Sequence, residues 1–264
     1  MTMPRHRHII LLALLLVSVF TRTATASALD YSGPKRQNAI IETTLIDALA
    51  PFLGIPYRED GVIDEQGQYI LFEHPETVIN SPGLNCSGLV VAAGRTLLHA
   101  NKPLANLTRD RNNDSGPDAP LGLDWDYGLD LILNISEELE RRQIMPEGAL
   151  QLPGVLDQAR MRGFNATDKK AWDAVQSQLR QDRVYLLSFN RLWHGRVHHH
   201  HVGLLLVDMQ GRNWLYQATR RSGVIRTDIR SASGFAAYRK LQLLWTDPQP
   251  KVLLLEVAPP FESP

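Results

Sequence analysis

The residues most able to do chemistry in this chain are its single cysteine and a run of histidines. Cys86 lies in the stretch "LNCSGLVVAAG", and His198 to His201 precede the apolar run "VGLLLVD". A cysteine thiolate is a nucleophile, an imidazole can serve as its base, and a third polar group can orient that imidazole. These residue types together indicate acyl-transfer chemistry.

The surroundings of Cys86 predict a helix that runs from about Cys86 to Ala100. The turn cluster "NSPG" precedes it, and apolar residues then recur at helical spacing. A thiol at a helix N-terminus lies near unpaired backbone N–H groups and the positive end of the helix dipole, which favour the thiolate. Gly88 would let another element or a substrate approach closely. The same position suits a small buried residue, so position alone leaves both roles open.

The histidine run lies at the start of a predicted strand. Side chains alternate along a strand, which predicts that His199 and His201 share one face and that His198 and His200 share the other. Only one of these faces can meet the cysteine helix. Two alternatives are a divalent-ion site, since imidazoles at i and i+2 can share a metal ion, and an exposed loop.

The next predicted strand, "NWLYQAT", carries Gln217. Its amide oxygen can accept a hydrogen bond from the far nitrogen of an imidazole and hold one tautomer, as an Asn does in related catalytic triads. The alternative is a polar side chain on the solvent face of the strand, which is the commoner position for a glutamine.

The elements that must position these residues change in type along the chain. Hydrophobic spacing predicts helices first and strands later, which favours an α+β fold with N-terminal helices packed on a C-terminal antiparallel sheet of about five strands. The predicted helices cover 38–53, 86–100, 129–142, 153–162 and 168–181; the predicted strands are 69–72, 184–189, 202–207, 214–218, 241–245 and 252–257.

Composition and the N-terminus indicate an exported protein. Lys plus Arg and Asp plus Glu both number 28, so there is no basic excess that would indicate a nucleic-acid partner. A basic lead, the apolar run 9–20 and Ala-Ser-Ala at 26–28 predict a signal peptide over 1–28, an uncleaved anchor being the alternative. No later segment predicts a membrane span. We therefore expect a periplasmic or secreted protein, in whose oxidising compartment an unpaired Cys86 is unusual.

Three segments in order, "FLGIPYRED", "LNCSGLVVAAG" and "HHHHVGLLLVDMQGRNWLYQAT", resemble the NlpC-type cysteine peptidases, papain-like enzymes that cut peptide bonds in bacterial cell walls. The most specific match is Cys-Ser-Gly-Leu-Val at 86–90, and the second is His-Val-Gly at 201–203. The resemblance implies that Cys86 is the nucleophile, that His201 is the base and later the acid, and that Gln217 orients His201.

The same resemblance implies the remaining parts of the site. Tyr57, Asn85 and Ser87 are the candidates for substrate or oxyanion binding, together with the backbone N–H of Cys86. It implies a single papain-like catalytic domain over 29–264, peptidoglycan stem peptides as the partner, and neither a metal nor a cofactor.

The chain departs from the family pattern at several positions. Asn85 stands where the family has Asp, and Glu59 and Asp60 stand near the place of a Gly-Gly pair. The stretch between Cys86 and His201 is also much longer than a minimal family member needs. The excess, at about 101–180, is interpreted as an insertion that forms a lid or a specificity wall beside the site.

The expected function is an exported thiol amidohydrolase, acting as a peptidoglycan endopeptidase that cuts stem-peptide amide bonds through Cys86, His201 and Gln217. One alternative keeps the papain-like fold but acts as a deamidase or acyltransferase on a non-wall amide. Another is not enzymatic: a protein that binds cell-wall peptides, or a periplasmic protein that binds metal through His198 to His201.

Overall fold

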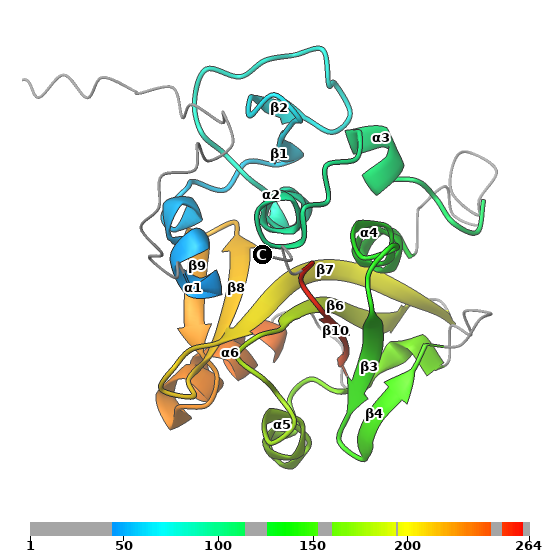
Figure 1. Cartoon of the computed structure of the whole chain (residues 1–264), viewed down its shortest axis with the longest axis vertical. Helices are drawn as coiled ribbons and strands as arrows, with labels where there is room; N and C mark the ends of the chain where they lie inside the picture. The colour runs from blue at the N-terminus through cyan, green and yellow to red at the C-terminus, as the bar shows by residue number, and fades with distance from the viewer. Residues whose placement is uncertain (1–43, 114–125, 153–159, 194, 244–249, 261–264) are drawn as a thin grey trace, which may run out of the picture. The chain divides into compact units, whose positions relative to one another are not determined.

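An antiparallel sheet of eight strands forms the centre of the computed structural model (Figure 1). The structure describes residues 44–113, 126–152, 160–193, 195–243 and 250–260, all within the unit Lys35–Pro264. The strand order is β4-β3-β10-β6-β7-β8-β9, and β5 also pairs with β10. The bounds are β3 Arg141–Met145, β4 Gly148–Gln151, β5 Phe164–Asn165, β6 Val184–Trp193, β7 Arg196–Val207, β8 Asn213–Thr219, β9 Gly223–Asp228 and β10 Lys251–Val257. The predicted signal peptide lies outside the described residues.

Helices lie on both faces of this sheet, with α2 and α4 on one side and α5 and α6 on the other (Figure 1). The described helices are α1 Leu45–Ala48, α2 Cys86–Leu98, α3 Leu104–Leu107, α4 Tyr127–Ile135, α5 Lys169–Gln176 and α6 Ala232–Leu243, with short 3-10 turns at Ala50–Phe52 and Arg160–Arg162. A separate two-stranded sheet joins β1 (Gly61–Ile63) to β2 (Tyr69–Leu71) and contacts α2.

Both faces of the central strands are buried, which explains their continuous apolar sequence. Along β6, Val184 and Leu186 belong to the core beneath α2 and α4, whereas Tyr185 and Leu187 belong to the opposite core with Trp172 of α5. A strand covered on both sides has no polar face and therefore shows no polar–apolar alternation. The position of the central strands could thus be recognised from the sequence, but not which residues face α2.

The predicted fold class is wrong. We expected a papain-like α+β domain with N-terminal helices packed on a sheet of about five strands. The described part of the chain is instead dominated by the eight-stranded antiparallel sheet and the small second sheet, and its helices are few and mostly short. The missed strands are short, and β3 begins with Arg141 and Arg142, the last two residues of the helix predicted over 129–142. Such short strands carry little hydrophobic periodicity.

Several individual elements are confirmed. The helix predicted from Cys86 is α2, which ends at Leu98, where His99 adopts a left-handed conformation. The strands predicted over 184–189, 202–207, 214–218 and 252–257 all lie within β6, β7, β8 and β10, and the strand predicted over 69–72 is β2.

Other predicted elements differ from the structure. The strand predicted over 241–245 is wrong in its described part, because α6 continues to Leu243 and packs Phe235 and Tyr238 into the second core. The helix predicted over 38–53 is, in its described part, only the single turn α1 followed by a 3-10 turn that contains Pro51, a residue that cannot continue a helical hydrogen-bond ladder. Most of the helix predicted over 153–162 lies outside the described residues.

The described parts of the proposed insertion at about 101–180 contribute to the sheet and to its cover. In β3, Gln143 pairs with Leu255 of β10, and in β5, Phe164 pairs with Val252 of the same strand. Helix α4 contacts β6 and β7 as well as α2. These residues therefore extend the hydrophobic core, in addition to any effect they have on the site.

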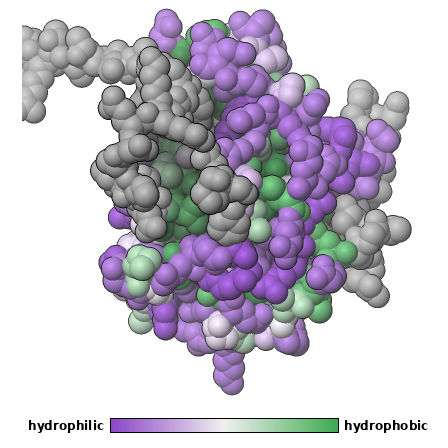
Figure 2. Space-filling view, in the orientation of Figure 1, coloured by the Kyte–Doolittle hydropathy of each residue, from purple (hydrophilic) through white to green (hydrophobic). Residues whose placement is uncertain are grey.

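Hydrophilic residues make up most of the coloured surface in Figure 2, and hydrophobic residues are visible between them. The large apolar side chains exposed among the described residues come from separate segments: Val78, Leu150, Leu192 and Met209. None of the described helices is long and apolar enough to cross a membrane.

Candidate active site

Cys86 is the first residue of α2, and Asn85 caps this helix. The side-chain oxygen of Asn85 accepts a 2.7 Å hydrogen bond from the N–H of Gly88. The N–H of Asn85 in turn donates a 3.1 Å bond to the carbonyl oxygen of Gly61 in β1. These bonds fix the helix start beside β1, and the positive end of the helix dipole acts directly on the thiol.

Gly88 lets α2 pack directly against β1. A Cβ atom at this position would lie 2.0 Å from the carbonyl oxygen of Gly61, far closer than any non-bonded contact. The element that approaches Gly88 is therefore the β1 backbone. The glycine of the Cys-Ser-Gly motif holds the nucleophile-bearing helix against the small sheet.

A bulge in β7 separates the histidines. His201 pairs with Phe189 of β6 and His199 pairs with the next residue, Asn190, so His200 has no paired position on β6. An extra residue of this kind interrupts side-chain alternation. Because Phe189 and Asn190 are consecutive, the paired His201 and His199 lie on opposite faces. The prediction that they share a face is wrong, because it assumed a regular strand.

Cys86, His201 and Gln217 form one hydrogen-bonded group. His201 Nε2 lies 3.1 Å from Oε1 of Gln217, and His201 also hydrogen-bonds to Cys86. Because an amide oxygen only accepts, Nε2 carries the proton, and Nδ1 is left to face the sulfur. His201 and Gln217 are 7% and 2% exposed, whereas Cys86 is only half-buried. The base and its partner are thus held in the core, while part of the surface of Cys86 is exposed.

The electrostatics of this group favour an ion pair between thiolate and imidazolium. Burial would raise the pKa of Cys86, but the charge of His201 and its hydrogen bond, helped by Val202 and Ser87, lower that pKa to about 7. Burial would lower the pKa of His201, yet the attraction and hydrogen bond of Cys86 raise it. Each partner stabilises the charged form of the other, as an activated thiol nucleophile requires.

The ladder between β7 and β8 ends before Val202. Its pairs run only from Leu204 to Val207 of β7, although β8 continues to Thr219. The backbone of Val202 lies beyond this ladder and hydrogen-bonds to Cys86 instead. The nucleophile therefore sits where β7 and β8 are no longer paired.

The three residues predicted to bind substrate or oxyanion have different positions. Tyr57 forms a parallel bridge with Leu84, two residues before the nucleophile, and is half-buried. Burial raises the pKa of Tyr57, with a further contribution from the charge of Cys86. Ser87 is 7% exposed and hydrogen-bonds to Cys86, and Asn85 caps α2. Asn85 and Ser87 thus serve the helix start and the sulfur, which leaves Tyr57 as the side chain best placed to meet a substrate.

The other histidines have separate environments. Nδ1 of His199 lies 2.8 Å from the hydroxyl of Ser188, and burial lowers the pKa of His199 to about 3, so this ring is neutral. The rings of His198 and His200 lie 5.9 Å apart, and His198 also contacts Trp193. Within the described ranges, none of the histidines belongs to a group of three side chains that could share a metal ion.

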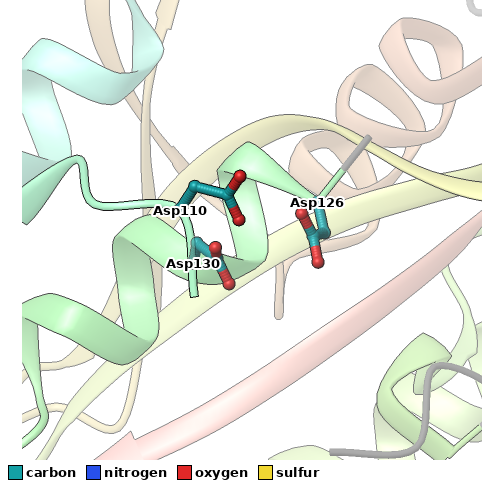
Figure 3. A group of neighbouring side chains, drawn as sticks. All are labelled: Asp110, Asp126 and Asp130. Atoms are coloured by element: carbon teal, nitrogen blue, oxygen red, sulfur yellow. The ribbon is translucent and has the colours of Figure 1, made fainter. Parts of the chain in front are cut away.

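Three aspartates that the sequence analysis did not select lie together at the start of α4 (Figure 3). Asp110, Asp126 and Asp130 each offer a carboxylate oxygen, all within 4.8 Å of one another. Asp130 accepts a hydrogen bond from the backbone of Arg111, and Asp126 accepts one from the side chain of Asn112. These bonds hold the segment after α3 against α4. In the sequence, Asp110 lies in the polar stretch "RDRNND", and Asp126 and Asp130 lie in the stretch "DYGLD".

Comparison of the chain with protein-family models, curated proteins and solved structures found no match. The geometry of the site combines a half-buried cysteine at a helix N-terminus, a buried imidazole, and an amide that holds the imidazole in one tautomer.

Proposed function

We propose that this protein is an exported thiol amidohydrolase. The observation that carries the proposal is the convergence of Cys86, His201 and Gln217 from α2, β7 and β8, with the pKa of Cys86 lowered to about 7. A thiolate paired with an imidazolium, whose far nitrogen is held by an amide, is suited to nucleophilic acyl transfer.

In the first half of the reaction the Cys86 sulfur attacks the carbonyl carbon of an amide. A carbon–sulfur bond forms, and the carbonyl electron pair moves to oxygen. The backbone N–H of Cys86, at the positive end of α2, stabilises this oxyanion. His201 then gives its Nδ1 proton to the amine as the carbon–nitrogen bond breaks, which leaves a thioester on Cys86 and a neutral imidazole.

In the second half, Nδ1 of His201 takes a proton from water while the water oxygen attacks the thioester carbon. The tetrahedral intermediate expels the Cys86 thiolate and releases a carboxylic acid. The proton on His201 restores the ion pair. Throughout, the side-chain oxygen of Gln217 accepts a hydrogen bond from the Nε2–H of His201 and so keeps the ring from turning this nitrogen towards the sulfur.

For the substrate we propose the stem peptides of peptidoglycan, cut after export to the periplasm or beyond it. This part of the proposal rests on the likeness of residues 86–90 and 201–203 to the NlpC-type motifs and on the predicted signal peptide. The proposal concerns the chemistry of the site and does not depend on the papain-like fold that the structure contradicts.

We expect the mature protein to cut isolated muropeptides and Cys86→Ala to leave them intact. Mass spectrometry in ¹⁸O-labelled water measures both cleavage and the fate of the acyl group, because hydrolysis places label in the new carboxylate and transfer to an amine does not. The variant Met209→Ala, at an exposed position, is the control for handling and purity. Identical products from wild type and Cys86→Ala, or ammonia release without chain cleavage, would contradict the proposed endopeptidase activity.

A further inference from the structure

The turn between β8 and β9 is hydrogen-bonded to the segment that carries Tyr57. The N–H of Gly54 donates to the carbonyl of Val224, and the N–H of Val224 donates to the carbonyl of Ile55, both at 2.9 Å. Gly223 has φ +67°, and a Cβ there would lie 2.3 Å from the carbonyl oxygen of Ile55. Only a glycine permits this conformation and this approach at once, so the turn has a fixed position relative to Tyr57.

The segment that carries Tyr57 is also hydrogen-bonded to the segment that precedes the nucleophile. Besides the bridge between Tyr57 and Leu84, the N–H of Leu84 donates to Pro56 at 3.0 Å, and the N–H of Arg58 donates to Leu84 at 3.2 Å. Leu84 precedes Cys86 by two positions. The β8–β9 turn, Tyr57 and Cys86 therefore belong to one hydrogen-bonded assembly.

Arg220 supplies a cation to this assembly from the β8–β9 turn. Its guanidinium lies 2.6 Å from the carboxylate of Glu59 and hydrogen-bonds to the hydroxyl of Tyr57. The side chains of Arg220 and Glu59 are 75% and 73% exposed. An ion pair so exposed adds little to folding stability and exchanges readily with other anions. The acyl-transfer mechanism does not use either residue.

We propose that Arg220 binds a free carboxylate of the substrate beside the amide that Cys86 attacks, and that Glu59 occupies the guanidinium when no substrate is bound. A guanidinium offers two parallel N–H donors that match a carboxylate, and the Tyr57 hydroxyl adds a third polar group. The substrate class is then a peptide with a free carboxylate next to the scissile bond. The peptide part of the test below rests on the proposed hydrolase function, whereas the alkylation part does not.

The first experiment compares alkylation of Cys86 by iodoacetate with that by iodoacetamide, two reagents of similar size that differ in carrying a carboxylate or an amide. The ratio of the two rates cancels any change in thiolate fraction. We expect Arg220→Ala to lower this ratio about threefold, the scale of an exposed charge pair, and Glu59→Gln to raise it. Arg221→Ala, in the same turn and with the same loss of charge, is the matched control. Equal ratios in wild type and Arg220→Ala, or an equal fall in Arg221→Ala, would overturn the proposal.

The second experiment uses a stem peptide with a free carboxylate beside the scissile amide and the same peptide with that carboxylate amidated. Arg220→Ala is expected to raise KM about tenfold for the acidic peptide, to leave kcat similar, and to leave the amidated peptide nearly unaffected. Equal effects on both peptides would contradict the carboxylate site. If the wild type cuts neither peptide while the alkylation ratio still depends on Arg220, the endopeptidase proposal fails and the anion site stands.

Discussion

Replacing His201 with alanine is expected to lower kcat/KM by about 10²–10⁴-fold, the usual contribution of a general acid–base group. The substitution removes the proton donor for the leaving amine and the cation that stabilises the Cys86 thiolate. His201 is 7% exposed and packs beside Phe189, with 5.4 Å between ring centres. The stability of the His201→Ala variant should therefore be measured alongside its activity.

A variant of His198, a neighbour of His201 in β7, provides the matched control for this experiment. His198 lies in the same run but contacts Trp193 and His200, so His198→Ala is expected to keep most of the activity. Gln217→Ala keeps the imidazole but removes its acceptor, and an intermediate loss is expected. A variant His198→Ala that loses more activity than His201→Ala would mean that His201 is not the residue of β7 that pairs with Phe189.

Replacing Gly88 with alanine is expected to have the second largest effect, on stability and activity together. The new methyl group would lie 2.0 Å from the Gly61 carbonyl oxygen. Since the methyl group is bonded directly to the α2 backbone and the oxygen belongs to the β1 backbone, α2 or β1 must move. Overpacking of this kind costs about 1–3 kcal/mol of unfolding free energy, and the movement displaces Cys86 from His201. Urea unfolding and kcat/KM are the measurements.

Gly94 offers a control in the same helix. A Cβ at Gly94 would meet the Cγ2 atom of Ile135 at 2.7 Å, and because this methyl group belongs to a buried, β-branched side chain of α4, relief of the contact requires a shift of α4 rather than of β1. The higher helix propensity of alanine, worth about 1 kcal/mol, offsets part of this cost. Gly94→Ala should therefore lose some stability but remain active, because the contact between α2 and β1 is unchanged. Equal losses of kcat/KM in the two variants would show that the contact between α2 and β1 does not decide the position of the nucleophile.

The parts of the fold that the sequence predicts are those whose signal is local. The helix at Cys86 follows from a turn, a capping residue and helical spacing, and the central strands follow from apolar runs rich in Val and Leu. The sequence does not predict that helices cover both faces of the sheet, because α6 combines Phe235 and Tyr238 with exposed polar residues and carries only a weak apolar stripe. Strand β3 pairs with the distant β10 as well as with its neighbour β4, so its own residues carry little signal of its place in the sheet.

The candidate site shows the same division. The identities of Cys86, His201 and Gln217 could be proposed from residue types and their order, and the structure brings these three side chains together. The bulge at His200 could not, since it depends on how β6 and β7 pair. Arg220 was missed because it lies in a turn, and only the pairing of Gly54 and Val224 shows that this turn meets Tyr57.

The pH dependence of Cys86 alkylation tests the central claim, that His201 activates this thiol. Only the thiolate reacts, so the rate with iodoacetamide should rise with pH and reach half its maximum near pH 7, where the structure places the thiol pKa. In His201→Ala the loss of the imidazolium should move this midpoint upwards, to or above the reference thiol pKa of about 8.5. A wild-type midpoint near 8.5 that His201→Ala leaves unchanged would contradict the account.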